Sequence, residues 1–174
     1  MDGPAVERAL ARMADEVVVL AAGATELVLV GIHRRGVQLS VMLRDLLRER
    51  SQLALATGSL DITLYRDDLM VVGPRPVVGQ TRLPEGGIDG RTVCIVDDVL
   101  YTGRTVRAAL DELADFGRPR RTLLAVLVDR GGRELPIQAD VVGERVEVPE
   151  GGRVEVSVPE IDGELGVDLV AAGG

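Results

Sequence analysis

Apolar residues along the chain alternate between two periods, one typical of helices and one typical of buried strands. Val6, Leu10, Met13 and Val17 recur at intervals of three and four residues, which predicts an amphipathic helix over 4–20. Helical spacing returns over 37–48 and 104–113, and alternation predicts a strand at 59–65. Largely apolar segments at 26–32, 92–98 and 122–128 predict buried strands. Because strands that are apolar on both faces alternate with helices, the pattern predicts an α/β fold with a parallel sheet flanked by helices.

The pattern changes in two places. Residues 66–90 are punctuated by proline and glycine and have little apolar periodicity, which predicts a long, flexible loop of the kind that often forms a functional lid. Farther along, short alternating segments at 139–142, 145–148 and 153–158 predict a small β-rich hood over about 139–174. A length of 174 residues fits a single domain spanning residues 1–174.

The composition excludes several chemistries. All 20 basic residues are arginine, and the absence of lysine rules out a Walker A phosphate loop and a Schiff-base site. His33 is the only histidine and Cys94 the only cysteine, which rules out an intrachain disulfide and a zinc site built from several such ligands. No acidic residue close in sequence partners His33, so the sequence does not indicate a general base there.

The net charge of −8 is unevenly distributed. Residues 31–60 hold five arginines and two acids, whereas residues 134–174 hold two arginines and ten acids. An acidic tail disfavours a generic binder of nucleic-acid backbones, which needs a basic face. The apolar runs are too short to span a membrane, and the first of them follows acidic residues, unlike a secretion signal. We therefore expect a cytoplasmic protein with a reduced, buried cysteine.

The segment from Val93 to Thr105 carries the candidate chemistry. Two acids, Asp97 and Asp98, follow the apolar strand residues, and a turn of small residues beginning at Thr102 opens the next helix. Ligands of open α/β sheets bind at the carboxyl ends of strands. The turn offers hydroxyls, a glycine and the N–H groups of a helix N-terminus, which suit a phosphate, and the acids suit the vicinal hydroxyls of a ribose. The alternative is a loop and helix cap without a ligand.

This segment resembles the phosphoribosyl-pyrophosphate (PRPP) signature of type I phosphoribosyltransferases. The resemblance extends to Asp61-Ile62-Thr63-Leu64-Tyr65-Arg66-Asp67-Asp68, to Ala125-Val126-Leu127-Val128-Asp129-Arg130-Gly131 and to Arg133-Glu134-Leu135-Pro136-Ile137. Together these motifs are similar to those of the PyrR family, pyrimidine-operon attenuation regulators that also have uracil phosphoribosyltransferase activity. The resemblance covers roughly residues 5–145. It implies the type I phosphoribosyltransferase fold, with a flexible lid and a hood.

The resemblance also implies roles for the matching residues. Asp97 and Asp98 would bind the ribose hydroxyls and act in catalysis, together with Arg66 of the lid, which would reach the pyrophosphate. The 5′-phosphate would lie on Thr102, Gly103, Arg104 and Thr105, with Val99, Leu100 and Tyr101 in the same substrate-binding segment. Gly31, His33, Arg34 and Arg35 match the pyrophosphate loop, and Asp129 and Arg130 match the wall near the nucleobase. Without the resemblance, Arg34 and Arg35 could be solvated arginines at the start of a helix. The segment 128–131 could likewise be an ordinary strand end followed by a glycine turn.

The function that the resemblance implies is the conversion of uracil and PRPP to UMP and diphosphate. Mg²⁺ would enter mainly with PRPP, with no direct protein ligand, near Asp97 and Asp98. The family also implies a homo-oligomer, a dimer or higher. Two alternatives stay open, namely a UMP-responsive RNA-binding attenuator that uses the same pocket as a sensor, and a phosphoribosyltransferase for another base.

RNA as a partner is where the sequence departs from the family pattern. Positions that face RNA in the regulators read Ala11 and Asp15 in the first predicted helix. Downstream they read Gly132, Gln138 and Glu144 where His, Arg and Lys are expected, while Arg133 remains. Because neutral and acidic groups do not contact phosphates favourably, these replacements favour the enzyme over the RNA-binding regulator.

Overall fold

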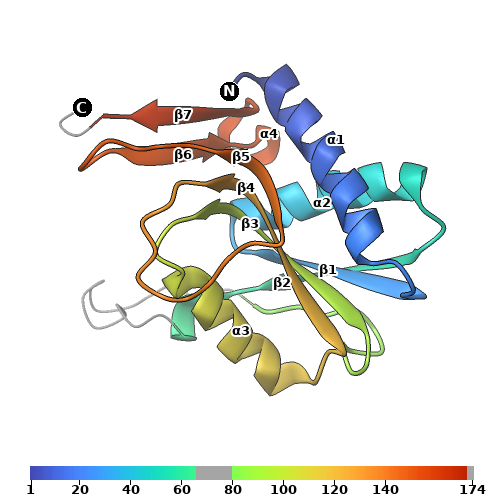
Figure 1. The fold of residues 1–174 in the computed structure, drawn as a ribbon. Helices are drawn as coiled ribbons and strands as arrows, with labels where there is room; N and C mark the ends of the chain where they lie inside the picture. The colour runs from blue at the N-terminus through green and yellow to red at the C-terminus, as the bar shows by residue number, and fades with distance from the viewer. Residues whose placement is uncertain (66–79, 172–174) are drawn as a thin grey trace.

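A five-stranded parallel sheet forms the centre of the molecule (Figure 1). The computed structural model describes residues 1–65 and 80–171. The strand order is β2-β1-β3-β4-β5, and all neighbouring strands are parallel. The strands are β1 (Glu26–Ile32), β2 (Ala54–Leu60), β3 (Thr92–Leu100), β4 (Arg121–Asp129) and β5 (Val141–Arg145). The predicted fold class is confirmed, and all five carboxyl ends lie at the same edge of the sheet.

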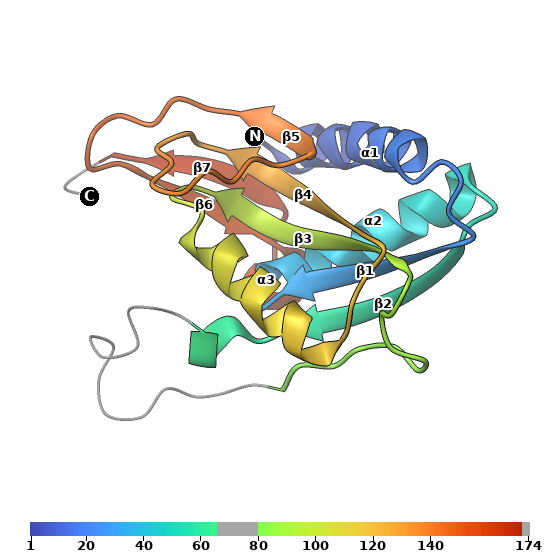
Figure 2. The same ribbon diagram turned by 60° about the horizontal axis from the view of Figure 1, so that its bottom comes forward.

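Helices cover both faces of the sheet (Figure 2). On one face, α1 (Gly3–Leu20) and α2 (Arg35–Arg50) pack against each other and against the sheet. On the other face lie α3 (Arg104–Phe116) and the short 3-10 helix η1 (Ile62–Tyr65). Because neighbouring strand residues point to opposite faces, Cys94 and Val96 join the first core while Val93 and Ile95 join the second. Among the described residues, no helix is long and apolar enough to cross a membrane.

The predicted strand at 59–65 is wrong. The strand is β2, which begins at Ala54 opposite Glu26 of β1 and ends at Leu60. The chain then turns because the Asp61 carboxylate accepts hydrogen bonds from the backbone N–H, at 3.0 Å, and the hydroxyl of Thr63. This local capping starts η1 where alternation alone predicts more strand.

The β-rich end of the chain divides between two sheets. The strand predicted at 139–142 corresponds to β5, which extends the parallel sheet, whereas no strand forms at 145–148 as a separate element. The hood is the antiparallel pair β6 (Arg153–Ser157) and β7 (Gly166–Val170), joined through α4 (Pro159–Asp162). The sequence analysis did not predict β7. Its Val167 N–H donates to the Met1 carbonyl at 2.9 Å, which ties the hood to the start of α1.

Only the last part of the predicted lid lies among the described residues. Residues 66–79, with the candidate catalytic Arg66, lie outside them. Arg82 pairs with Ser59 through two backbone hydrogen bonds of 2.7 and 2.9 Å, and Ile88 is fully buried. Thr81 also accepts the Asp61 N–H at 3.0 Å, so the described residues Thr81, Arg82 and Ile88 of the predicted lid are part of the packed domain.

Candidate functional site

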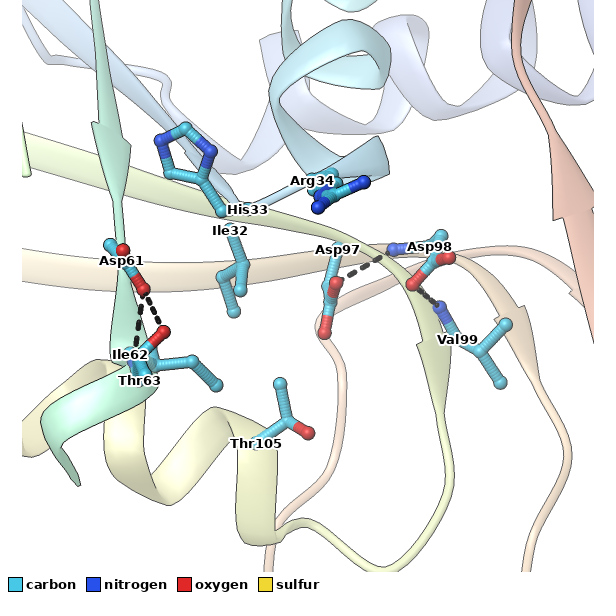
Figure 3. A pocket seen from close by; sticks show the side chains of 10 residues that line it. All are labelled: Ile32, His33, Arg34, Asp61, Ile62, Thr63, Asp97, Asp98, Val99 and Thr105. Carbon is cyan, nitrogen blue, oxygen red and sulfur yellow. Dashed lines mark hydrogen bonds between the residues drawn. The ribbon is translucent and has the colours of Figure 1, made fainter. Parts of the chain in front are cut away.

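A polar cavity of about 530 Å³ lies at the carboxyl edge of the sheet (Figure 3). It is formed where the ends of β1 and β3 meet the start of η1 and the first turn of α3. Its lining residues are Ile32, His33, Arg34, Asp61, Ile62, Thr63, Asp97, Asp98, Val99 and Thr105. The cavity thus brings together the predicted ribose acids, part of the pyrophosphate loop and one hydroxyl of the phosphate turn.

The two acids occupy different environments at the end of β3. Asp97 is buried, and its Oδ1 accepts the backbone N–H of Asp98 at 3.0 Å. The Oδ1 of Asp98 accepts the N–H of Val99 at 2.8 Å, and the Asp98 side chain is partly exposed. Burial, with a smaller contribution from the charge of Asp98, raises the pKa of Asp97 well above its ordinary value. The pair therefore presents one buried and one partly exposed carboxyl group at the end of β3.

Two glycines allow the loop after β1 to lie close against the end of β3. A Cβ on Gly31 would lie 2.4 Å from the Cα of Val37, and a Cβ on Gly36 would lie 2.5 Å from the carbonyl oxygen of Val96. No larger residue fits at either position, so the close approach requires glycine. The loop is thereby held beside Asp97, and the His33–Arg34 peptide bond within it is cis.

Arg35 does not line the cavity with its neighbours His33 and Arg34. Its guanidinium makes a bidentate ion pair with Asp162 of α4, with Nε and Nη2 at 3.1 and 2.8 Å from the two carboxylate oxygens. The hydrogen bond to Asp162 is the main reason that the pKa of Arg35 is raised, and the same bond lowers the pKa of Asp162. The predicted pyrophosphate loop is therefore linked to the hood through Arg35.

The predicted phosphate turn is tightly built. Gly103 has a φ of 92°, and a Cβ placed there would lie 3.3 and 3.4 Å from the Cβ atoms of Ile137 and Leu135. The N–H of Arg104 donates to the Thr102 hydroxyl at 3.3 Å, and α3 begins at Arg104. Since Gly103 is the N-cap and has no side chain to accept hydrogen bonds, the N–H groups that follow Arg104 in the first turn of α3 can bind an anion.

The remaining candidates lie beside this turn. Leu100 is buried in the core, so only its backbone is placed to reach a ligand. The Arg130 guanidinium stacks on the half-exposed Tyr101 ring, 4.0 Å from its centroid, and donates to the Gly152 carbonyl at 2.9 Å. Burial alone would raise the pKa of Asp129, but hydrogen bonds from Arg133 and the Gly131 N–H outweigh it and lower that pKa.

Comparison with known proteins identifies the family. A phosphoribosyl transferase domain model matches residues 1–154. The chain is 52% identical over 170 residues to the bifunctional protein PyrR of Roseiflexus sp., covering 98% of this chain and 91% of the relative. It is 52% identical over 169 residues to the bifunctional protein PyrR of Thermus aquaticus, covering 97% and 93%. The chain belongs to the PyrR family of phosphoribosyltransferases.

Solved structures confirm the phosphoribosyltransferase fold. A hypoxanthine phosphoribosyltransferase from Trypanosoma cruzi, in a ternary complex with substrates, has a TM-score of 0.71 at 21% identity, covering 98% of this chain and 92% of that one. A hypoxanthine phosphoribosyltransferase from Staphylococcus aureus has a TM-score of 0.65 at 20% identity, covering 98% and 89%. At these identities the likeness concerns the fold alone.

The sequence analysis of this PyrR family member missed three cavity residues, Asp61, Ile62 and Thr63. They belong to a motif that carried the family resemblance, but within it only Arg66 was given a role. Figure 3 shows the Asp61 side chain on the same side of the cavity as His33, with its hydrogen bonds to Thr63. An Asp followed two residues later by Thr is a signal for a capped turn, which could have placed η1 at the sheet edge.

Proposed function

We propose that the protein is a uracil phosphoribosyltransferase, which converts uracil and PRPP to UMP and diphosphate. The observation that supports this proposal most is that the paired acids Asp97 and Asp98 line one cavity together with Thr105 of the predicted phosphate turn, at the N-terminus of α3. This arrangement matches a ribose that carries a 5′-phosphate. The choice of uracil as the base follows from membership of the PyrR family, because the residues that line the cavity do not by themselves identify the base.

In this proposal the ribose hydroxyls donate to Asp97 and Asp98, and the 5′-phosphate accepts from the turn that contains Gly103 and Thr105. The diphosphate lies toward the loop of His33 and Arg34. The bond between C1′ and the diphosphate oxygen breaks, the bond between C1′ and N1 of uracil forms, and the N1 proton passes to solvent. The positive charge that develops on the ribose is stabilised by the nearby carboxylates, and Arg34 stabilises the departing anion.

Mg²⁺ is the cofactor that we propose, bound mainly through PRPP. The carboxylates of Asp97 and Asp98 supply oxygen atoms beside the proposed ribose site, the donor type that Mg²⁺ prefers together with phosphate and water. When bound, the ion neutralises charge on the diphosphate. The chain's own residues hold the ribose and orient C1′ toward the base. Arg66 and a closing segment that excludes water remain part of this proposal, although they lie outside the described residues.

The test is a PRPP-dependent assay that compares uracil with hypoxanthine, adenine and orotate, reading the release of diphosphate and the formation of nucleotide. We expect turnover with uracil and at least about 100-fold lower kcat/KM with each other base, because a site built to bind one base leaves its polar groups unpaired with another. Equal or better turnover with a purine or with orotate contradicts the proposal. Turnover of none of the four contradicts the enzymatic function as a whole.

A further inference from the structure

Arg133 lies beside the proposed phosphate turn and points inward. Its Nε donates to the Ile137 carbonyl at 2.9 Å, and its Nη1 donates to the carbonyls of Tyr101 and Gly131 at 2.9 and 3.3 Å. Its Nη2 lies 2.7 Å from Oδ2 of Asp129, and its side chain is 21% exposed. Four hydrogen bonds thus engage a group that has five N–H donors.

The acceptors of Arg133 belong to three separate segments. Asp129 ends β4, Tyr101 begins the loop between β3 and α3, and Ile137 ends the segment 131–137. A guanidinium is planar, so its donors fix the directions of these three segments relative to one another. A lysine at the same position carries the same charge but offers only a point donor and cannot make this set of bonds.

The segment 131–137 supports the phosphate turn from outside. The carbonyl oxygen of Thr102 accepts the N–H groups of Glu134 and Leu135 at 3.0 and 3.1 Å. The Cα of Gly103 faces the side chains of Leu135 and Ile137, where an added Cβ would be in contact. Displacement of this segment would therefore remove two hydrogen bonds and a packing surface from the residues that precede α3.

We propose that Arg133 is a positioning residue for the phosphate turn, which holds the segment 131–137 against Asp129 and Tyr101 so that the turn is preorganised for a 5′-phosphate. Arg133 itself does not contact the substrate. The inference rests on the proposed function, since it assumes that the turn binds the 5′-phosphate of PRPP and of the nucleotide product. The proposal also gives Arg133 a role other than a contact with RNA, because most of the N–H donors of its guanidinium already have protein acceptors.

The test is the Arg133→Lys variant, which keeps the charge opposite Asp129. We expect KM for PRPP and Kd for UMP to rise about 10-fold or more, because a small misplacement of binding groups is costly. KM for uracil should rise less, because Asp129 near the nucleobase keeps its hydrogen bond from the Gly131 N–H. The matched control is Arg153→Lys, which alters an exposed arginine paired with Glu155 in the hood, and we expect it to leave all three constants unchanged. Unchanged PRPP and UMP constants in Arg133→Lys, or an equal rise in all three, overturn the inference.

Hydrogen exchange provides a readout that does not depend on turnover. In Arg133→Lys, the peptide that contains Glu134 and Leu135 should exchange at least about 10-fold faster, because these N–H groups bond to Thr102, while peptides from α1 keep their protection. Unchanged exchange in that peptide overturns the inference, as does a loss of RNA binding with unchanged substrate constants. If the wild type fails to use PRPP with any base but this peptide still loses protection, the proposed function falls while the structural role of Arg133 stands.

Discussion

At the scale of single residues, Asp97 is a polar group in an environment that disfavours its charge. It is buried in the wall of the cavity, and both burial and the neighbouring Asp98 raise its pKa. Because the raised pKa belongs to the folded state, that state binds more protons than the unfolded state between the two pKa values. The free energy of unfolding therefore falls as pH rises through this window. Such a cost is typical of residues retained for function rather than for stability.

This argument predicts that Asp97→Asn is more stable than the wild type and less active. Asparagine keeps an oxygen for the Asp98 N–H and cannot ionise, so the midpoint of thermal unfolding should rise by at least about 2 °C at about pH 7.5. The gain should shrink as the pH falls toward about 4, because the folded state regains the proton of Asp97 in that range. Asp45→Asn, which alters an exposed aspartate on α2, is the control without this effect. A gain that is constant across pH would show that ionisation of Asp97 is not its cause.

Asp98→Asn should separate chemistry from folding. The variant keeps an oxygen for the Val99 N–H but loses the charge that faces the ribose, so kcat/KM should fall at least about 100-fold. The midpoint of thermal unfolding should stay within about 2 °C of the wild type, as measured by circular dichroism. The surface variant Asp111→Asn on α3, which loses an exposed ion pair with Arg107, should keep full activity. Near-normal kcat/KM in Asp98→Asn would contradict the role in ribose binding.

At the scale of elements, the site depends on how closely α2 approaches β3. Gly36 lies in the first turn of α2, and a Cβ there would meet the carbonyl oxygen of Val96 at 2.5 Å and the Cα of Asp97 at 3.3 Å. Both neighbours are backbone atoms of a central strand, so the helix has to move instead. The first residues that such a movement displaces are those of the loop that contains Arg34.

Gly36→Ala should therefore lower the free energy of unfolding by about 1–3 kcal/mol, measured in urea, and raise KM for PRPP more than KM for uracil. Gly166→Ala in β7 is the matched control. Its added Cβ would lie 3.4 Å from the Met1 carbonyl oxygen, an ordinary contact, so its stability should change by less than about 1 kcal/mol. If Gly36→Ala matched Gly166→Ala in both the free energy of unfolding and KM for PRPP, close packing at Gly36 would not determine the position of the loop that contains Arg34.

Elements with a regular apolar pattern could be predicted from the sequence, both the buried strands and the amphipathic helices α1, α2 and α3, whereas the half-buried strand β2 could not. The strands β1, β3 and β4 are largely apolar segments, and their predicted positions agree with the structure within two residues at either end. In contrast, β2 is an edge strand of small, half-buried residues, which gives no alternating signal.

The same distinction applies to the candidate site. Asp97 to Thr105 form one continuous segment, so adjacent residues predict it. The pair of Arg35 with Asp162 and the inward position of Arg133 depend on contacts between distant segments. The hydrogen bond of Thr81 with the buried Glu112 of α3 is of the same kind. No local pattern of residues contains this information.

At the scale of the whole molecule, the distribution of charge bears on RNA as a partner. Among the positions that face RNA in the regulators, Gly132, Gln138 and Glu144 are exposed and none is basic. Asp15 on α1 is acidic and makes an ion pair of 3.0 Å with Arg50, and Arg133 is turned inward. Residues 134–174, which include the hood, hold ten acids and two arginines. These surfaces therefore offer few basic side chains to the phosphate groups of RNA.

We accordingly predict weak binding of the leader RNA of the protein's own pyrimidine operon, with Kd above about 1 μM at physiological salt and no response to UMP in a gel-shift titration. A variant that combines Gln138→Arg and Glu144→Lys should bind the same RNA more tightly and with a steeper salt dependence, because each added cation releases counterions from the phosphates. Its KM for PRPP and kcat should stay unchanged, since neither residue lines the cavity. Tight binding by the wild type that UMP strengthens would instead show that the attenuator function persists without these basic residues.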